Sequence, residues 1–163
     1  MYINRKSRLY LYRHPTHLNM SGFHWVHCSN FNIPPNAVKC GNDLDGSDIF
    51  AGLSYYQRDE LPCKIIPRRR EAYVSYDGRE IKVNDFKILC EKKMCWLPSR
   101  DGQVPAGAIP AGKTASGETL YIGRVNMGGV TKVGKVHSSH KCLYVPYNGK
   151  EIMFKSYEVL VLH

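Results

Sequence analysis

The chain has 163 residues, of which 43 % are hydrophobic and 23 % are charged. These fractions are typical of one globular domain and exclude a disordered or fibrous protein. The formal net charge of +9 favours anionic partners without identifying one, and no apolar run approaches the roughly 18 residues that a membrane-spanning helix needs.

The N-terminal tail, residues 1–24, carries four basic residues and no acidic one. It lacks the apolar core of roughly 7 to 15 residues that a secretory signal contains. We therefore expect a poorly ordered tail and a cytoplasmic protein, although a mitochondrial presequence and non-classical secretion stay open. In the cytosol the six cysteines should be reduced thiols.

Beyond the tail, short runs rich in β-branched and aromatic residues alternate with Gly, Pro, Asn and Asp. The runs are residues 48–53, 61–66, 71–76, 85–89, 119–125, 132–136, 142–147 and 157–161. This spacing predicts an all-β fold of antiparallel strands with little helix. Asp77-Gly78 and Asn148-Gly149 predict two-residue hairpin turns at matching places.

The chain also repeats itself with an offset of 71 residues. Residues 25–92 align without a gap on residues 96–163. The identical positions of the first copy are Trp25, Pro34, Ala37, Gly41, Gly46, Gly52, Lys64, Tyr73, Val74, Tyr76, Gly78, Glu80, Ile81 and Leu89. A unit of about 70 residues is marginal for a core of its own. We therefore expect two antiparallel β units, related by a pseudo-twofold axis, in one compact domain over residues 25–163.

The repeated motifs resemble the DM-nine repeat family. The most specific are Tyr-Val-Pro-Tyr-Asn-Gly at 144–149 and Tyr-Glu-Val-Leu at 157–160. The resemblance implies a carbohydrate-binding protein, because family members include invertebrate lectins that bind mannose and act in pattern recognition and innate immunity. Many members have no assigned activity.

The resemblance also implies a sugar site. In the lectins an aspartate of a Gly-x-Asp-x-Asp-Gly loop and the lysine of Pro-Gly-Lys hold the sugar, which points to Asp43 and Lys64 here. Cys63 stands where the family has Gly. The residue chemistry agrees, since a carboxylate accepts hydrogen bonds from sugar hydroxyls and an ammonium donates them. Asp45 and Glu60 are expected to orient these groups; an ordinary loop salt bridge is the alternative.

The second copy has lost the acidic residues of this pattern. Asp43 and Glu60 correspond to Thr114 and Thr131, whereas Lys135 is retained at the position of Lys64. Without a carboxylate the loop lacks a bidentate acceptor. We expect a weakened second site at Lys135 and Thr114.

Three consecutive arginines, Arg68, Arg69 and Arg70, form a candidate site for an anionic membrane surface. They support an alternative function, a non-lectin intracellular adaptor or a membrane-associated stress-response protein. No nucleic-acid recognition motif accompanies them, so nucleic acid is a disfavoured partner. A homodimer is left open.

Enzymatic and metal signals are weak. Residues 107–114 match the phosphate-binding loop string, but the following segment is strand-like and not helical, so we expect no nucleotide. No catalytic motif and no structural-zinc spacing is present. We therefore expect no catalytic residue, no cofactor and no metal.

Overall fold

The computed structural model describes residues 22–91 and 93–163; the prediction for the rest of the tail, residues 1–21, lies outside this range. The all-β prediction is confirmed. The first copy contributes β1 His24–Cys28, β2 Lys39–Asn42, β3 Asp48–Tyr56, β4 Asp59–Ile66, β5 Glu71–Tyr76, β6 Arg79–Lys82 and β7 Phe86–Cys90. The second contributes β8 Met94–Arg100, β9 Pro110–Lys113, β10 Thr119–Met127, β11 Val130–His137, β12 Cys142–Tyr147, β13 Lys150–Phe154 and β14 Ser156–Leu162.

The helical segments within the described residues are two 3₁₀ turns, η1 Pro67–Arg69 and η2 Ser138–His140. Neither is long and apolar enough to cross a membrane. Each ends at a residue in the left-handed conformation, Arg70 and Lys141, which turns the chain directly into the next strand.

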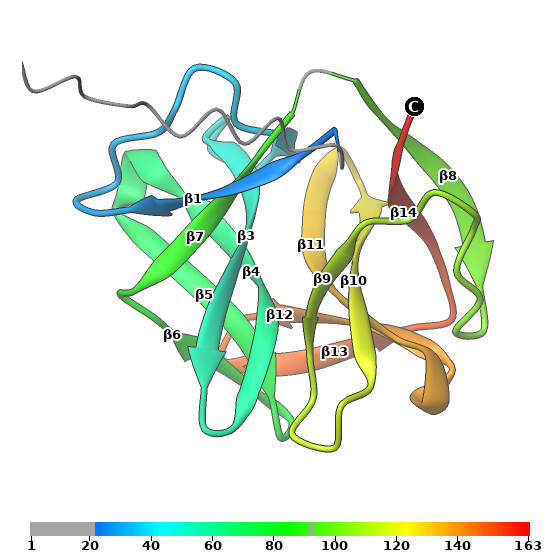
Figure 1. Ribbon diagram of the computed structural model, residues 1–163. Coiled ribbons are helices and arrows are strands. Elements are labelled where there is room, and N and C mark those ends of the chain that lie inside the picture. Colours follow the sequence, from blue (N-terminus) through cyan, green and yellow to red (C-terminus); the bar gives the residue numbers. More distant parts are fainter. Residues whose placement is uncertain (1–21, 92) are drawn as a thin grey trace, which may run out of the picture.

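The two copies use the same elements in the same order. The bounds of β2, β3, β4, η1 and β5 recur in β9, β10, β11, η2 and β12 with an offset of 71 residues. The main path of paired strands is β1-β7-β3-β4-β5-β6-β13-β12-β11-β10-β14-β8, whose second half reverses the order of the first. In Figure 1 the path begins with β1 and β7 at left and ends with β14 and β8 at right.

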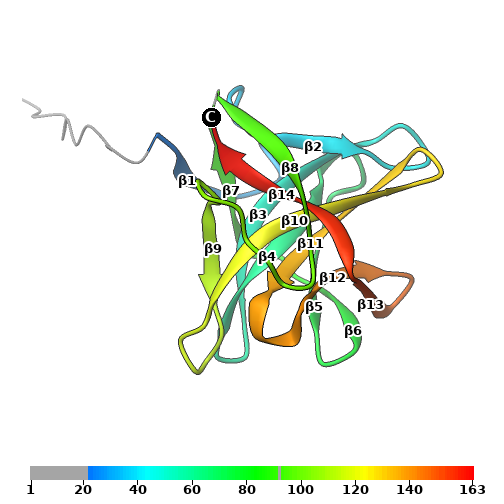
Figure 2. The same cartoon turned by 90° about the vertical axis from the view of Figure 1, so that its right-hand side faces the viewer.

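The copies meet at β6 and β13. Glu80 N–H donates to the carbonyl of Gly149 at 3.1 Å, and Glu151 N–H donates to the carbonyl of Gly78 at 2.9 Å. Each bond is the other one shifted by 71 residues, so the contact is reciprocal. Figure 2 shows the hairpins β5–β6 and β12–β13 together at one end of the molecule. Reciprocal contacts are those expected of a pseudo-twofold relation, which stays a prediction for the fold as a whole.

A second connection closes the strand path. Strand β9 pairs with β10 of its own copy and also with β4 of the first copy, where Lys113 lies opposite Glu60. Gly112 makes this approach possible, because a Cβ there would lie 2.1 Å from the carbonyl oxygen of Glu60. Strands β4, β5, β6, β13, β12, β11, β10 and β9 thus form a continuous ring of paired strands.

The core draws on both copies. Ile49, Ile66 and Leu89 of the first copy share one buried cluster with the second-copy residues Ile122 and Leu160. The two tryptophans, Trp25 and Trp96, lie partly buried against this cluster. The core therefore fixes the orientation of the strands that carry the polar pockets.

Candidate functional site

A polar pocket, here pocket A, lies where the first copy meets the β10–β11 and β12–β13 hairpins. Its volume is about 290 Å³. It is lined by Asp43, Leu44, Lys64, Arg69, Glu71, Tyr73, Glu80, Val130, Lys132, Tyr147 and Asn148. The structure therefore brings together Asp43 and Lys64, the two principal residues of the predicted sugar site, and adds groups from both copies.

Asp43 is held by the turn between β2 and β3. Its N–H donates to the carbonyl of Ser47 at 2.9 Å, and its own carbonyl accepts from Gly46, whose positive φ suits glycine. One carboxylate oxygen accepts from the Leu44 N–H, and the other accepts a short hydrogen bond from Arg69. Each oxygen keeps a second lone pair for a ligand hydroxyl.

Arg69 fixes the charge of this loop. From η1 it donates to Asp43, to Asp45 at 3.2 Å and to Glu71 at 3.2 Å. Burial alone would raise the pKa of Asp43, but the hydrogen bond and positive charge of Arg69 outweigh it and hold that pKa below its ordinary value. The carboxylate is therefore ionised at neutral pH and can accept charge-assisted hydrogen bonds. Arg69 is a site residue that the sequence prediction had assigned to a different surface.

The three arginines, residues 68–70, are exposed, and their role at an anionic membrane surface stays a prediction. Arg69 is ion-paired with three carboxylates. Arg70 lies 5.6 Å from the centre of the Phe31 ring and donates to the carbonyl of Asn30. Arg68 lines a different pocket, beside Phe50 and Pro67. Arg69 and Arg70 thus have acidic and aromatic partners on the protein itself.

Lys64 lies on β4 with its side chain only 9 % exposed. Its ammonium donates to the carbonyl of Pro146 at 2.8 Å and to Glu80 at 3.3 Å, and lies 5.2 Å from the centre of the Tyr73 ring. Burial lowers the pKa of Lys64, and the Glu80 carboxylate offsets part of that effect. Because an ammonium has three donors, one remains for a ligand in pocket A.

Two of the predicted residues are placed differently. Glu60 does not line pocket A; it lines a separate pocket with Asp85 and lies 3.9 Å from the Lys87 ammonium. This corrects the expectation that it orients the sugar-binding pair, and the reason is that it pairs with β9, away from Asp43. Asp45 acts on pocket A only through Arg69, and its other oxygen accepts from the Ser47 N–H at 2.9 Å.

The side chain of Cys63, which stands where the family has glycine, fits into the structure without a clash. The Cys63 side chain is buried, and burial raises its thiol pKa to about 12, so it is an inert packing group. At the equivalent Gly134 a Cβ would lie 1.9 Å from the carbonyl oxygen of Tyr144. The second copy requires the family glycine, whereas the first copy has room for a side chain. All six cysteines are free.

A second polar pocket, pocket B, has a volume of about 600 Å³. It is lined by Asp59, Tyr76, Asp77, Gly78, Lys135, His137, His140, Tyr144 and Glu151. Lys135 repeats the arrangement of Lys64: it donates to the carbonyl of Ser75 at 2.7 Å and lies 3.1 Å from Glu151. The predicted second site thus has its lysine inside a pocket.

Pocket B obtains carboxylates from the first copy. Thr114 does not line it, and its hydroxyl accepts from the Glu118 N–H at 3.1 Å. Asp59 does line it, and it holds the neighbouring turn by accepting from the Ala115 N–H at 2.8 Å. The loop at Thr114 has no carboxylate, as its sequence shows, but pocket B has carboxylates from Glu151 of the second copy and from Asp59 and Asp77 of the first.

Two stacked histidines further distinguish pocket B. The ring centres of His137 and His140 lie 3.6 Å apart. Burial and the neighbouring His140 lower the pKa of His137, while Glu118, 3.2 Å away, partly opposes them. Within residues 22–91 and 93–163, no three His, Cys, Asp or Glu side chains gather closely enough to hold a metal ion.

Comparisons with known proteins agree with this architecture. The DM9 repeat model matches residues 43–154. Natterin-1 of Thalassophryne nattereri is 27 % identical over 152 residues, which cover 88 % of this chain and 39 % of natterin-1. Natterin-3 of the same organism is 30 % identical over 95 residues, which cover 56 % of this chain and 24 % of natterin-3. The chain thus spans less than half the length of these curated relatives.

A solved structure supports the fold alone. The nematode sperm cell motility protein MFP2B is similar with a TM-score of 0.55 and 16 % sequence identity, over 85 % of this chain and 45 % of that one.

Proposed function

Because the chain belongs to the DM9 repeat family, we propose that it is a carbohydrate-binding protein that holds a mannose-type glycan in pocket A. One observation carries the proposal: the Asp43 carboxylate and the Lys64 ammonium, from separate segments of the chain, line one pocket. Asp43 accepts hydrogen bonds from neighbouring sugar hydroxyls, and Lys64 donates to a hydroxyl or ring oxygen. In this proposal the protein binds the sugar and catalyses no reaction on it.

Arg69 completes the site in this proposal. A guanidinium has five N–H donors, and contacts to three carboxylates leave others free. Tyr147 adds an aromatic face at the edge of the pocket, where its side chain is partly exposed. Sugar rings pack their C–H faces on such surfaces. These two residues come from different copies, so the site depends on both.

The affinity of one such site is expected to be about millimolar, or roughly −4 kcal/mol. Useful binding to a glycan-coated surface would therefore need several sites at once, from an oligomer or from pockets A and B together. The pattern-recognition role in innate immunity rests on the family resemblance.

Calorimetric titration with mannose oligosaccharides tests the proposal. Asp43→Asn should weaken binding at least tenfold, because a neutral amide loses the charge-assisted hydrogen bonds. Asp48→Asn is the matched control, since Asp48 lies in the same hairpin and pairs with Lys39 outside pocket A. Equal heats for wild type and Asp43→Asn would rule out the assigned role, and a glycan array would identify the preferred sugar.

A further inference from the structure

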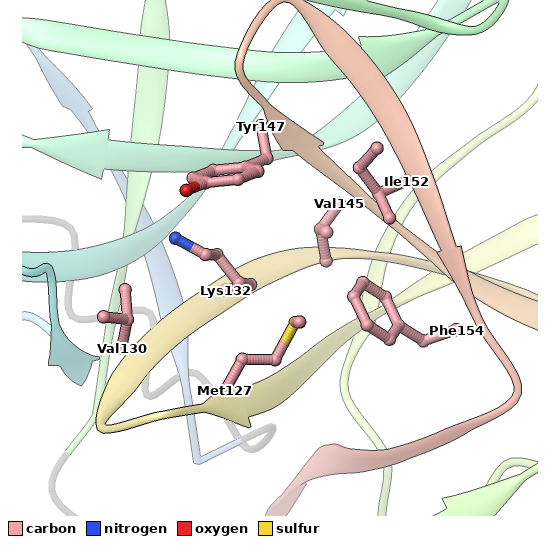
Figure 3. A pocket seen from close by; sticks show the side chains of 7 residues that line it. All are labelled: Met127, Val130, Lys132, Val145, Tyr147, Ile152 and Phe154. Atoms are coloured by element: carbon pink, nitrogen blue, oxygen red, sulfur yellow. The ribbon is translucent and has the colours of Figure 1, made fainter.

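An apolar hollow borders pocket A. Figure 3 shows the side chains that line this hollow. Its volume is about 390 Å³. It is lined by Met127, Val130, Lys132, Val145, Tyr147, Ile152 and Phe154. These side chains come from β10, β11, β12 and β13 and converge on one space, to which Lys132 contributes the single charge among the lining residues.

The apolar hollow and pocket A share a wall. Val130, Lys132 and Tyr147 line both. The Lys132 ammonium lies 3.8 Å from the centre of the Tyr147 ring, and Figure 3 shows it pointing toward that ring. A ligand bound in pocket A therefore lies against the same pair of side chains that borders the hollow.

The equivalent position of the first copy holds an aromatic side chain. There the Tyr56 ring packs edge-on against Tyr76, with ring centres 5.1 Å apart. The residues at the equivalent positions of the second copy are Met127 and Tyr147. Tyr147 thus lacks the aromatic partner that Tyr76 has, and Met127 is 52 % exposed beside the open hollow.

We infer that the apolar hollow is a subsite for an aryl group attached to the sugar in pocket A, so that the protein prefers aryl glycosides over simple ones. This inference rests on the proposed function. The aryl ring would pack against Tyr147 as Tyr56 packs against Tyr76. A dry cavity of about 150 Å³ already binds benzene, so the hollow has room for one ring. Burial of the ring with an aromatic contact should strengthen binding about tenfold.

The experiment compares methyl α-mannopyranoside with phenyl α-mannopyranoside by calorimetric titration of the whole chain. Wild type should bind the phenyl glycoside about tenfold more tightly. Met127→Tyr supplies the ring that the first copy has, so it should fill the hollow and reduce the phenyl advantage to less than about twofold. It should leave affinity for the methyl glycoside unchanged.

Met153→Tyr is the matched control. Met153 lies on β13, is similarly exposed at 53 %, and does not line the hollow, so its variant should keep the full phenyl advantage. Equal affinities of wild type for the two glycosides would overturn the inference and leave the proposed function standing. A phenyl advantage that survives Met127→Tyr would also overturn it. Absence of binding to both glycosides would refute the proposed function and, with it, the inference.

Discussion

Pockets A and B occupy equivalent places in the two copies and share one frame, a buried lysine beside a glutamate and a tyrosine. In pocket A three carboxylates stand against three fixed positive charges: Asp43, Glu71 and Glu80 against Lys64, Arg69 and Lys132. In pocket B three carboxylates face one lysine and two histidines: Asp59, Asp77 and Glu151 against Lys135, His137 and His140. The duplicated frame was kept while the surrounding charges changed, so the two pockets should differ in pH dependence and ligand preference.

The largest difference in stability between equivalent substitutions of the two copies is expected at Cys63 and Gly134. Gly134→Cys should lower the free energy of unfolding by about 4 kcal/mol or more, because the added Cβ would collide with the carbonyl oxygen of Tyr144 and force β11 from β12. Cys63→Gly should cost only about 1 to 2 kcal/mol, through lost packing and greater backbone freedom. Urea unfolding of both variants checks this, and equal losses would show that the copies tolerate the same backbone spacing.

The shared frame itself should be equally important in the two copies. Lys64→Met and Lys135→Met each remove one member of a buried ion pair and leave Glu80 or Glu151 without its cation. Each should cost about 3 kcal/mol, measured by chemical denaturation. A loss of less than about 1 kcal/mol in the free energy of unfolding for one variant would contradict this equality. It would mean that the lysine of that copy contributes more to binding than to stability.

The arginine loop offers a comparison within pocket A. Arg69→Ala should cost about 1 kcal/mol, because it breaks partly exposed ion pairs to Asp43 and Glu71. Arg68→Ala should change stability by less than about 0.5 kcal/mol. A larger effect at Arg68 than at Arg69 in denaturation experiments would contradict the arrangement of this loop.

The smallest expected effect is that of pH on pocket B. The folded-state pKa of His137 lies below that of the unfolded chain, so on acidification through about pH 6.5 the unfolded state takes up the proton first. Stability from this residue is therefore present at higher pH and declines as the pH falls through that range. His140, Glu118, Lys135 and Tyr144 surround the ring and set this balance.

The measurement is urea unfolding at pH 7.5 and 5.5 with wild type and His137→Gln. The variant should lose less stability on acidification than wild type. Identical losses would mean that His137 does not titrate differently in the folded protein. No histidine lines pocket A among the described residues, so the difference between wild type and His137→Gln reports on pocket B.

Much of the fold follows from local sequence. The hairpin turns at Asp77-Gly78 and Asn148-Gly149 lie where their sequences place them, with φ positive at all four residues. The predicted runs did not include β1, β2, β6, β8, β9 and β13. In β2 and β9, Gly41 and Pro110 interrupt the alternation of β-branched residues that marks a strand. These two strands pair with β3 and β10 of their own copies, and each also approaches the opposite copy: Gly41 lies against Thr131, and Gly112 against Glu60.

The candidate site was predicted only as far as local motifs reach. The loop motif located Asp43, and the Pro-x-Lys position located Lys64. Lys132 in pocket A and Asp59 in pocket B were missed because each comes from the other copy. The place of Arg69 in pocket A was not predicted, because its ion pairs bridge 24 and 26 residues, beyond the reach of sequence spacing. Residues that one copy contributes to the pocket of the other copy cannot be found from motifs within a single repeat.

The reciprocal contact between β6 and β13 has a consequence for the ancestry of the fold. Two edges that bind each other through the same bonds, each displaced by one repeat, make the contact expected of two identical molecules related by a twofold axis. A single ancestral repeat could have joined a second molecule of itself through this edge, and fusion of the two genes would then have freed each half to diverge. Cleavage of the polypeptide between residues 91 and 93 would reveal whether the two fragments still associate.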